Sequence, residues 1–331
     1  MVQCHIAIQQ LQSGGLITNY YCSSTCAHCL YRCSPAWPKD FITSDAARKA
    51  MATIQQLGCS AIHIGGGEPL LNIDGLIEAL HVAREMDMDI DYVETNASWF
   101  RDPIRGRDTL VRLRNAGLST LLISISPFHN EHIPFIRTRG LIEACQDVGI
   151  GVFPWISNFI GDLQQFDETV PHDLSAYQHH FGEDYLENLP NRYWISKGGR
   201  ALETFAPFQR RIPLDELLTL EQSGCSELMV TSHFHIDLYG NYVPGLCSGI
   251  SIRQNDLGTQ LIDADYPLIN LLYHSGISGL LSYAEKDFSF VPAQEAYGIK
   301  CKLCYEIRRF LVIKKGWKSH ELQPEGHYRF G

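Results

Sequence analysis

Three cysteines that follow one short apolar segment constrain this chain more than any other feature. Residues 16–21 are mostly β-branched, apolar or aromatic, which is typical of a short strand. Cys22, Cys26 and Cys29 come directly after this segment with the spacing C-x3-C-x2-C. Because cysteine thiolates are the usual protein ligands of iron–sulfur clusters, three of them on one loop can bind three irons of a 4Fe-4S cluster. The fourth iron then has no protein ligand, so a small molecule can bind it directly.

Strands and helices are expected to alternate after this loop. Helices are predicted at 44–57, 73–86 and 108–116, capped by Ser44 and Asp108 at their first residues, and a fourth helix ends before Gly149. Because the segment 119–126 is largely apolar on both faces, the sheet is predicted to be parallel and covered on both sides. This layout predicts an α/β fold. Strands are predicted at 16–21, 61–65, 91–95, 119–126 and 150–157, with a weaker sixth strand at 191–195.

Short motifs stand at the ends of these predicted strands. Gly66-Gly67-Glu68-Pro69 follows the second strand, Thr95-Asn96 the third, and Ser124-Ile125-Ser126 ends the fourth. Together with the cysteine triad, these motifs resemble those of the radical S-adenosylmethionine (radical SAM) superfamily, in the family's order, over residues 14–200. The resemblance is incomplete, because Ser126 and Ile133 stand where the family pattern has aspartates.

The resemblance implies a partial (β/α)6 TIM-like barrel, with its chemistry on loops at the carboxyl ends of the strands. It implies that SAM binds the open iron and that the stretch Gly66 to Pro69, including Glu68, receives its ammonium group. A flavodoxin- or ferredoxin-type reductant would then drive cleavage of SAM to a 5′-deoxyadenosyl radical, which takes hydrogen from the substrate. Candidates for the ribose and methionine carboxylate are Asn96, Ser124, Ser126, Asn158 and Arg200, with strand-end capping as the alternative. Candidates for the substrate space are His129, His132, Arg137, Trp155 and Tyr193, with packing as the alternative.

A second set of cysteines lies near the carboxyl terminus. A hairpin is predicted over 233–243 around Tyr239-Gly240-Asn241, with His233 and His235 on a polar face of its first strand. The set resembles a Twitch or shortened SPASM extension, which implies one auxiliary 4Fe-4S cluster. The alternative is a structural zinc site, because four cysteines also satisfy tetrahedral zinc. The set is Cys225, Cys247, Cys301 and Cys304, whereas the other four cysteines, Cys4, Cys33, Cys59 and Cys145, are predicted to be small buried apolar residues.

The length and charge of the chain limit the remaining possibilities. The predicted organisation is a lead-in at 1–13, a radical SAM barrel at 14–205, a linker at 206–224 and an auxiliary-cluster domain at 225–331. The net charge is −10 with no basic block, which disfavours nucleic-acid binding. No apolar run approaches the ~20 residues of a membrane span, and no signal peptide is visible. We therefore expect a cytoplasmic protein.

Three functions remain open. The first is an oxidoreductase or lyase that oxidises a small polar metabolite by dehydrogenation or decarboxylation, because an auxiliary cluster with four cysteine ligands would carry electrons. The second is a maturase that modifies a peptide by epimerisation, cross-linking or thioether formation. Since only about a dozen residues precede the first strand, where a leader-binding domain of small-domain size would stand, the first is preferred. The third is a non-enzymatic electron-transfer protein that binds an iron–sulfur cluster or zinc.

Overall fold

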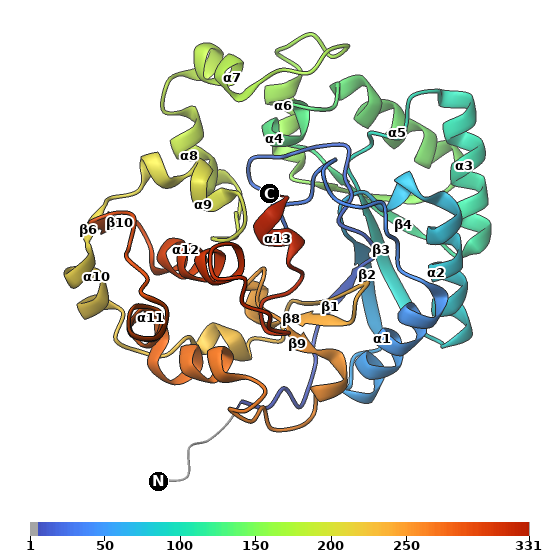
Figure 1. Ribbon diagram of the computed structural model, residues 1–331. Coiled ribbons are helices and arrows are strands. Elements are labelled where there is room, and N and C mark those ends of the chain that lie inside the picture. Colours follow the sequence, from blue (N-terminus) through green and yellow to red (C-terminus); the bar gives the residue numbers. More distant parts are fainter. Residues whose placement is uncertain (1–5, 331) are drawn as a thin grey trace.

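A parallel sheet forms the centre of the molecule (Figure 1). The computed structural model describes residues 6–330, so Cys4 lies outside the described residues. Five parallel strands stand in the order β5-β4-β3-β2-β1, so each later strand is added to the same side of the sheet, as an α/β layout predicts. These strands are β1 (Gly14–Ile17), β2 (Ala61–Gly65), β3 (Asp89–Thr95), β4 (Thr120–Ser124) and β5 (Gly151–Trp155).

Four long helices cover the outer face of these strands, on the right of Figure 1. Two predicted helix caps are wrong. Thr43, not Ser44, accepts the first-turn hydrogen bond of its helix, from the amide of Ala46. The third helix begins one and a half turns before Asp108, because Asp102 caps it and a proline follows directly at the first helical position. The helices are α1 (Ser44–Gln56), α2 (Ile73–Glu85), α3 (Pro103–Ala116) and α5 (Phe135–Val148).

The predicted sixth strand at 191–195 is wrong. Helix α8 (Tyr185–Arg192) covers its first residues, and residues 193–195 form a loop. The sheet instead continues on the other side of β1 with β7 (Phe234–Asp237), which pairs in parallel with β1. β8 (Asn241–Val243) and β9 (Ile252–Arg253) follow as antiparallel strands, so the predicted hairpin around Gly240 is confirmed. A segment beyond the predicted barrel therefore completes its central sheet.

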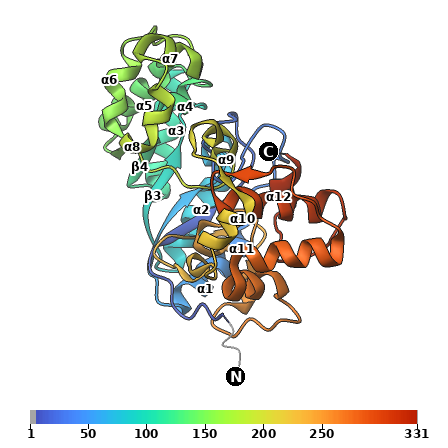
Figure 2. The ribbon, with the colours of Figure 1, turned by 90° about the vertical axis from the view of Figure 1, so that its left-hand side faces the viewer.

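Between β5 and β7 the chain forms short helices. Figure 2 shows α6 and α7 at the end of the molecule opposite α1. The segment predicted as a linker at 206–224 contains a helix and a strand that pairs with residues Ala296–Tyr297, so it is ordered structure. The elements are η2 (Ser157–Phe159), α6 (Ile160–Leu163), α7 (Leu174–Phe181), α9 (Ala201–Thr204), η3 (Ala206–Phe208), β6 (Ile212–Pro213) and α10 (Leu214–Leu220). One more short helix, α4 (Pro127–Asn130), lies earlier in the chain, between β4 and α5.

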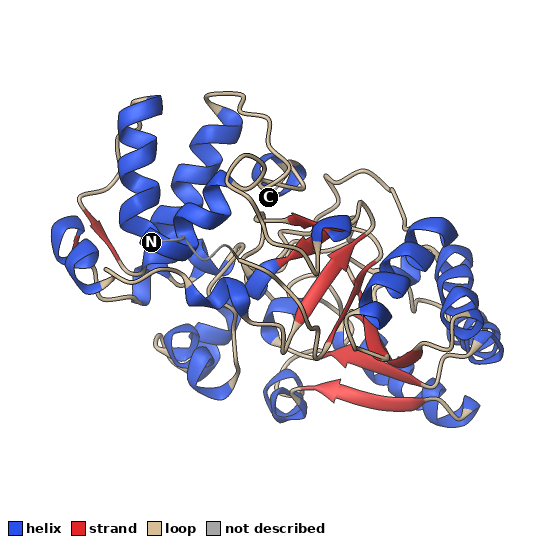
Figure 3. Ribbon diagram, turned by 90° about the horizontal axis from the view of Figure 1, so that it is seen from below, coloured by secondary structure: helices blue, strands red, loops and turns tan. Residues whose placement is uncertain are grey.

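The carboxyl-terminal third is mainly helical, and Figure 3 shows helices on both sides of the strands. Helix α11 (Pro267–Phe288) is interrupted at Gly276. Helix α12 (Lys300–Ile313) packs against α11 and contains both Cys301 and Cys304. No helix among residues 6–330 is long and apolar enough to cross a membrane. The remaining elements are η1 (Pro69–Leu71), η4 (Ser226–Met229), η5 (Pro244–Leu246), η6 (Gln254–Asp256), β10 (Ala296–Tyr297) and α13 (Gly326–Arg329).

Candidate active site

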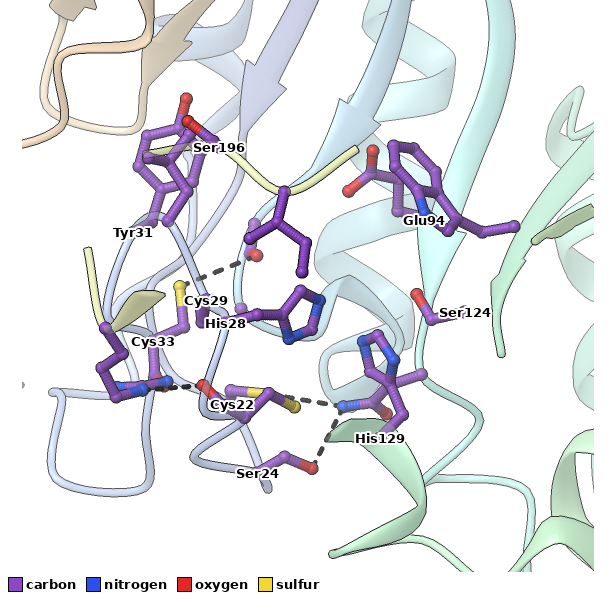
Figure 4. Close-up of a pocket in the computed structure, with 18 of the residues that line it drawn as sticks. Cys22, Ser24, His28, Cys29, Tyr31, Cys33, Glu94, Ser124, His129 and Ser196 are labelled. Atoms are coloured by element: carbon purple, nitrogen blue, oxygen red, sulfur yellow. Dashed lines mark hydrogen bonds between the residues drawn. The ribbon is translucent and has the colours of Figure 1, made fainter. Parts of the chain in front are cut away.

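The three cysteines of the triad lie on the loop after β1 and line one cavity of about 220 Å³ (Figure 4). The loop is tied to itself, because the Cys22 amide donates to Ser34 O at 3.2 Å and the Cys29 amide donates to Cys26 O at 3.1 Å. Cys22 and Cys26 are buried, and all three thiols are free. The structure therefore brings together the three ligands predicted from their spacing.

Residues 198–200, far away in sequence, hold this loop in place. The Arg200 side chain donates from Nε to Cys26 O at 2.8 Å and from Nη2 to Cys33 O at 2.6 Å, while its amide donates to Cys29 O at 3.0 Å. Gly199 has φ 56°, and a Cβ there would overlap the carbonyl group of Leu30. Only glycine allows this approach without strain. Arg200 lines the cavity, but its hydrogen bonds go to the cysteine loop.

The thiols of the triad differ in acidity. Burial, followed by the charge of Glu68, raises the pKa of Cys22 to about 12, and burial raises the pKa of Cys26 well above its usual value. A hydrogen bond with Cys33 lowers the pKa of Cys29 and raises that of Cys33. Cys22 and Cys26 therefore have to lose protons when a metal binds. Cys33 is buried, as predicted, but it also lines the cavity beside Cys29, whereas Cys59 and Cys145 are simply buried.

The turn Gly66–Pro69 packs its backbone against the same loop. The Gly67 amide donates to Asn19 O at 2.7 Å, and the Glu68 amide donates to Tyr21 O at 3.1 Å. A Cβ at Gly66 would lie 2.6 Å from Asn19 O, and one at Gly67 would lie 2.6 Å from the carbonyl carbon of Tyr21. Both glycines also line the cavity, so backbone is exposed to it where side chains would block the approach.

The Glu68 carboxylate does not line the cavity. It is fully buried and accepts hydrogen bonds from the Leu70 amide at 3.0 Å, the Thr95 hydroxyl at 3.0 Å and the Asn96 amide at 2.7 Å. Burial raises its pKa to about 7, although these donors act in the opposite direction. This differs from the expectation that Glu68 itself receives the ammonium group, because its carboxylate joins the turn to the end of β3. Pro69 begins η1 and is also buried away from the cavity.

The other predicted cofactor contacts divide into two groups. Asn96 and Ser124 line the cavity, and Asn96 Nδ2 lies 3.4 Å from Cys22 Sγ while its Oδ1 accepts from the Ser98 amide. Ser126 lies behind the wall, where its Oγ is 2.7 Å from His129 Nδ1 and so orients that ring. Asn158 is exposed and does not line the cavity.

The predicted substrate residues also divide. His129, Trp155 and Tyr193 line the cavity, whereas His132 and Arg137 do not. Glu94 on β3, which was not predicted from the sequence, also lines the cavity, beyond the cysteines. Burial raises its pKa to about 7, and the charge of Glu68 adds to this effect. Tyr31 and Ser196 were also missed, and Figure 4 shows both, with Glu94, on the side of the cavity opposite Cys22. Strand alternation within β3, which places Tyr92 and Glu94 on one face, is the signal that could have found Glu94.

The four carboxyl-terminal cysteines also come together. Cys225 precedes η4, Cys247 follows η5, and Cys301 and Cys304 lie in the first turn and a half of α12. Burial, and then the neighbouring Cys304, raises the pKa of Cys225 to about 12 and that of Cys301 to about 11. Burial raises the pKa of Cys247, and Cys301 and Cys304 act in the same direction. The four half-buried cysteines thus lie close enough together for their charges to interact.

Glycines and an arginine shape this second site. A Cβ at Gly224 would lie 2.7 Å from the carbonyl carbon of Tyr273, and one at Gly245 would lie 2.5 Å from that of Glu227, so both cysteine-bearing loops need glycine for their close approach. Arg308 is buried beside the site, where it hydrogen-bonds Cys304 and donates to Ser248 O at 2.9 Å. The charge of Arg308 favours the thiolate forms of Cys247 and Cys301.

A family model settles the class of the protein. Residues 16–159 match the model of the Radical SAM superfamily, and this span contains the cysteine triad and the Gly66–Pro69 turn. The chain is a radical SAM enzyme. Its cofactors are accordingly the 4Fe-4S cluster and SAM of that superfamily. No curated protein sequence matches this radical SAM enzyme.

Solved structures resemble the radical SAM enzyme only distantly. Native anSMEcpe with bound AdoMet is 12% identical, covers 70% of this chain and 74% of its own, and gives a TM-score of 0.38. Streptococcus suis SuiB bound to precursor peptide SuiA is 13% identical, covers 95% and 74%, and gives 0.34. HydG, a maturase of the [FeFe]-hydrogenase, is 16% identical, covers 54% and 41%, and gives 0.34. At these scores the likeness carries no argument about substrate or mechanism.

Proposed function

We propose that Cys22, Cys26 and Cys29 hold the catalytic cluster and that SAM lies between it and the Gly66–Gly67 turn. The support is geometric, because three free thiols, two glycines with accessible backbone and the Asn96 amide line one cavity. When bound, the reduced cluster supplies the electron that cleaves SAM, and the resulting 5′-deoxyadenosyl radical removes hydrogen from the substrate. Arg200 and Gly199 keep the loop in position, while Glu68 and Thr95 position Asn96 against Cys22.

We further propose an auxiliary 4Fe-4S cluster on Cys225, Cys247, Cys301 and Cys304. Thiolates on one tetrahedral zinc lie about 3.8 Å apart, whereas those on a cubane bind four separate irons and lie farther apart. Among residues 6–330, one group of three or more potential ligands has all its ligand atoms within 4.8 Å of one another, and it contains no cysteine. The cysteine spacing therefore supports a cluster over zinc. With four protein ligands, this cluster would relay electrons.

For the substrate, we propose a polar side chain of a peptide. The observation that supports this class is Trp194, which lines the cavity and yet is 64% exposed. An exposed tryptophan at the mouth of a reaction cavity is suited to contact residues flanking the one that reacts, because tryptophan is enriched among the residues that dominate protein interfaces. Structures of anSMEcpe with a Cp18Cys peptide and of SuiB with SuiA show that those two proteins bind peptides.

A free small polar metabolite is the second candidate. The observation that favours it is the polar lining of the cavity. His28, Ser124, His129 and Ser196 supply hydrogen-bonding atoms along its wall. A small metabolite and one side chain of a peptide both match this polar lining, and Trp194 is the feature that separates them.

The test measures 5′-deoxyadenosine made anaerobically from SAM and dithionite. Wild type is expected to form it and to contain seven to eight irons, as two cubanes require. The variant with Cys22, Cys26 and Cys29 all replaced by alanine is expected to keep about half the iron and to form none. Continued formation by this variant would refute the cluster assignment.

The substrate class is tested by adding cell extract, with or without prior peptidase digestion. A peptide substrate predicts that intact extract stimulates 5′-deoxyadenosine formation, that digestion removes the stimulation, and that Trp194→Ala weakens it. Trp317→Ala, which lies in the carboxyl-terminal region outside the cavity, is the matched control. Stimulation that survives digestion and is equal in both variants would favour the metabolite.

A further inference from the structure

Two histidines face each other across one row of the central sheet. In the parallel pairing of β1 with its neighbours, Gly15 stands opposite His63 of β2 and opposite His235 of β7. Residues in one row point to the same face, and strands on either side of β1 are about 10 Å apart. Because Gly15 has no side chain, the two imidazoles meet above it, with Nε2 atoms 2.9 Å apart. A Cβ at Gly15 would lie 2.7 Å from His63 Nε2.

A third histidine completes the group. His233 comes two residues before His235 and so points to the same face. Its ring centroid lies 5.3 Å from that of His63 and 5.0 Å from that of His235. One possible ligand atom from each of the three rings lies within 4.8 Å of the other two. Nitrogens that share a metal at about 2.1 Å lie about 3.0–3.4 Å apart, so small side-chain rotations bring all three to one ion.

The three rings are kept neutral, which is the form that binds metals. Burial, followed by the charge of His233, lowers the pKa of His63 to about 3, although a hydrogen bond with the Gly14 backbone acts against this. Burial also lowers the pKa of His235 well below its usual value and lowers that of His233. At neutral pH each ring therefore offers a nitrogen lone pair without first losing a proton.

Oxygen atoms surround the group. The Tyr31 hydroxyl lies 2.7 Å from His235 Nδ1, which leaves Nε2 directed at His63. Such a bond to the second ring nitrogen is what orients metal-binding histidines. Glu94 Oε1 lies 3.9 Å from His63 Nε2, and the glycine at position 65 makes room for it, since a Cβ there would lie 2.8 Å from Glu94 Oε2.

We propose that His63, His233 and His235 bind one divalent transition-metal ion, with Glu94 beside it as a further oxygen ligand. Neutral imidazoles and a carboxylate suit Zn²⁺ or Fe²⁺. The site opens into the reaction cavity, because Tyr31, Glu94, His233 and His235 line that cavity together with the cysteine triad. Figure 4 shows Tyr31 and Glu94 across the cavity from Cys22. With these four ligands bound, a five-coordinate ion keeps one further position, which faces the substrate space and binds a carboxylate or hydroxyl oxygen of the substrate, a role that rests on the proposed function.

The probe is Zn²⁺, added anaerobically to enzyme with reconstituted iron–sulfur clusters and followed by titration calorimetry. One equivalent is expected to bind. X-ray absorption at the zinc edge, which does not detect the iron clusters, is expected to show only nitrogen and oxygen ligands at about 2.0–2.1 Å. His235→Gln removes a ligand and is expected to weaken Zn²⁺ binding by at least about 100-fold, while Tyr31→Phe removes only an orienting bond and weakens it about 10-fold. His179→Gln, on the exposed face of α7, is the control and binds as wild type does.

Wild type decides the proposal even if a variant does not fold. Failure of wild type to bind Zn²⁺ overturns it, as does a zinc shell dominated by sulfur at about 2.3 Å, which would place the ion on cysteines. Equal affinity of folded His235→Gln and His179→Gln also overturns it. The binding experiment contains no SAM or reductant, so its failure is distinct from failure of the proposed function, which would appear as absence of 5′-deoxyadenosine.

Discussion

The contact between Gly199 and the cysteine loop provides the sharpest test of how the active site is held together. An alanine Cβ at position 199 would lie 2.6 Å from the carbonyl carbon of Leu30, in backbone next to Cys29. Both partners are backbone, so no flexible side chain can move aside. A left-handed backbone costs a residue with a Cβ about 1–2 kcal/mol, and forced overlap in a packed region costs about 1–3 kcal/mol more. We therefore expect Gly199→Ala to lower the free energy of unfolding by about 2–5 kcal/mol.

Gly149→Ala is the matched control. Gly149 also has a left-handed backbone, at φ 71°, but a Cβ there would meet no atom within 4 Å. Gly149→Ala is therefore expected to lower the free energy of unfolding only by the cost of a left-handed backbone, about 1–2 kcal/mol. Urea unfolding measures both stabilities, and iron content after anaerobic reconstitution measures the catalytic cluster. Gly199→Ala is expected to lose up to about half of the iron, as the loop shifts, while Gly149→Ala keeps all of it.

Equal stability and equal iron content in the two alanine variants would contradict this prediction. That result would mean that the stretch 198–200 rests against the cysteine loop without positioning it. Loss of stability in Gly199→Ala with full iron and normal SAM cleavage would separate the two effects and assign the contact to folding alone.

Three further outcomes are expected. In Glu68→Gln the side chain cannot accept hydrogen bonds from the amides of both Leu70 and Asn96, so Asn96 should be displaced. SAM binding, measured with the cluster intact, should therefore weaken about 10-fold. Unchanged SAM affinity would show that the hydrogen bond between Glu68 and Asn96 is not needed for binding. The double variant Cys301→Ala, Cys304→Ala should still form 5′-deoxyadenosine but no product. Stoichiometric zinc together with about four irons in wild type would contradict an electron-relay role for the auxiliary cluster. Burial raises the pKa of Glu321 to about 7, above its value in the unfolded chain, so its contribution to stability is present below about pH 4.5 and is lost as pH rises through about 7. Over this pH range the free energy of unfolding of Glu321→Gln should decline less than that of wild type, by an amount on the order of 3 kcal/mol. Equal declines in the two proteins would contradict this prediction.

The position of Glu68 changes how its motif is understood. A carboxylate with three hydrogen-bond donors is already satisfied, and reaching the cavity would leave two buried amides without an acceptor. Its effect on the cofactor is therefore expected to pass through Asn96, whose side chain contacts Cys22. The exposed backbone of Gly66 and Gly67 remains as the direct surface of this motif.

Local sequence determined much of this protein. The cysteine spacing on one short loop, the glycines after α3 and α5 and the apolar strands are patterns within a few residues. The sequence was therefore enough to predict the parallel sheet and the shared loop of the three cysteines, although β1 ends at Ile17 and not at residue 21. Turn chemistry likewise predicted the β7–β8 hairpin, because Gly240 occupies its left-handed position at φ 80°. Each of these features depends on contacts close along the chain.

Tertiary structure decided the rest. The sixth parallel strand could not be predicted, because β7 pairs with β1 across more than two hundred residues and no local pattern encodes that pairing. The same pairing changes the meaning of His233 and His235. On an isolated hairpin they are a polar face, but beside Gly15 and His63 they become a buried cluster of neutral imidazoles that opens into the reaction cavity. The histidines could be seen in the sequence, but the distances between their ring nitrogens depend on the pairing of β1 with β2 and β7.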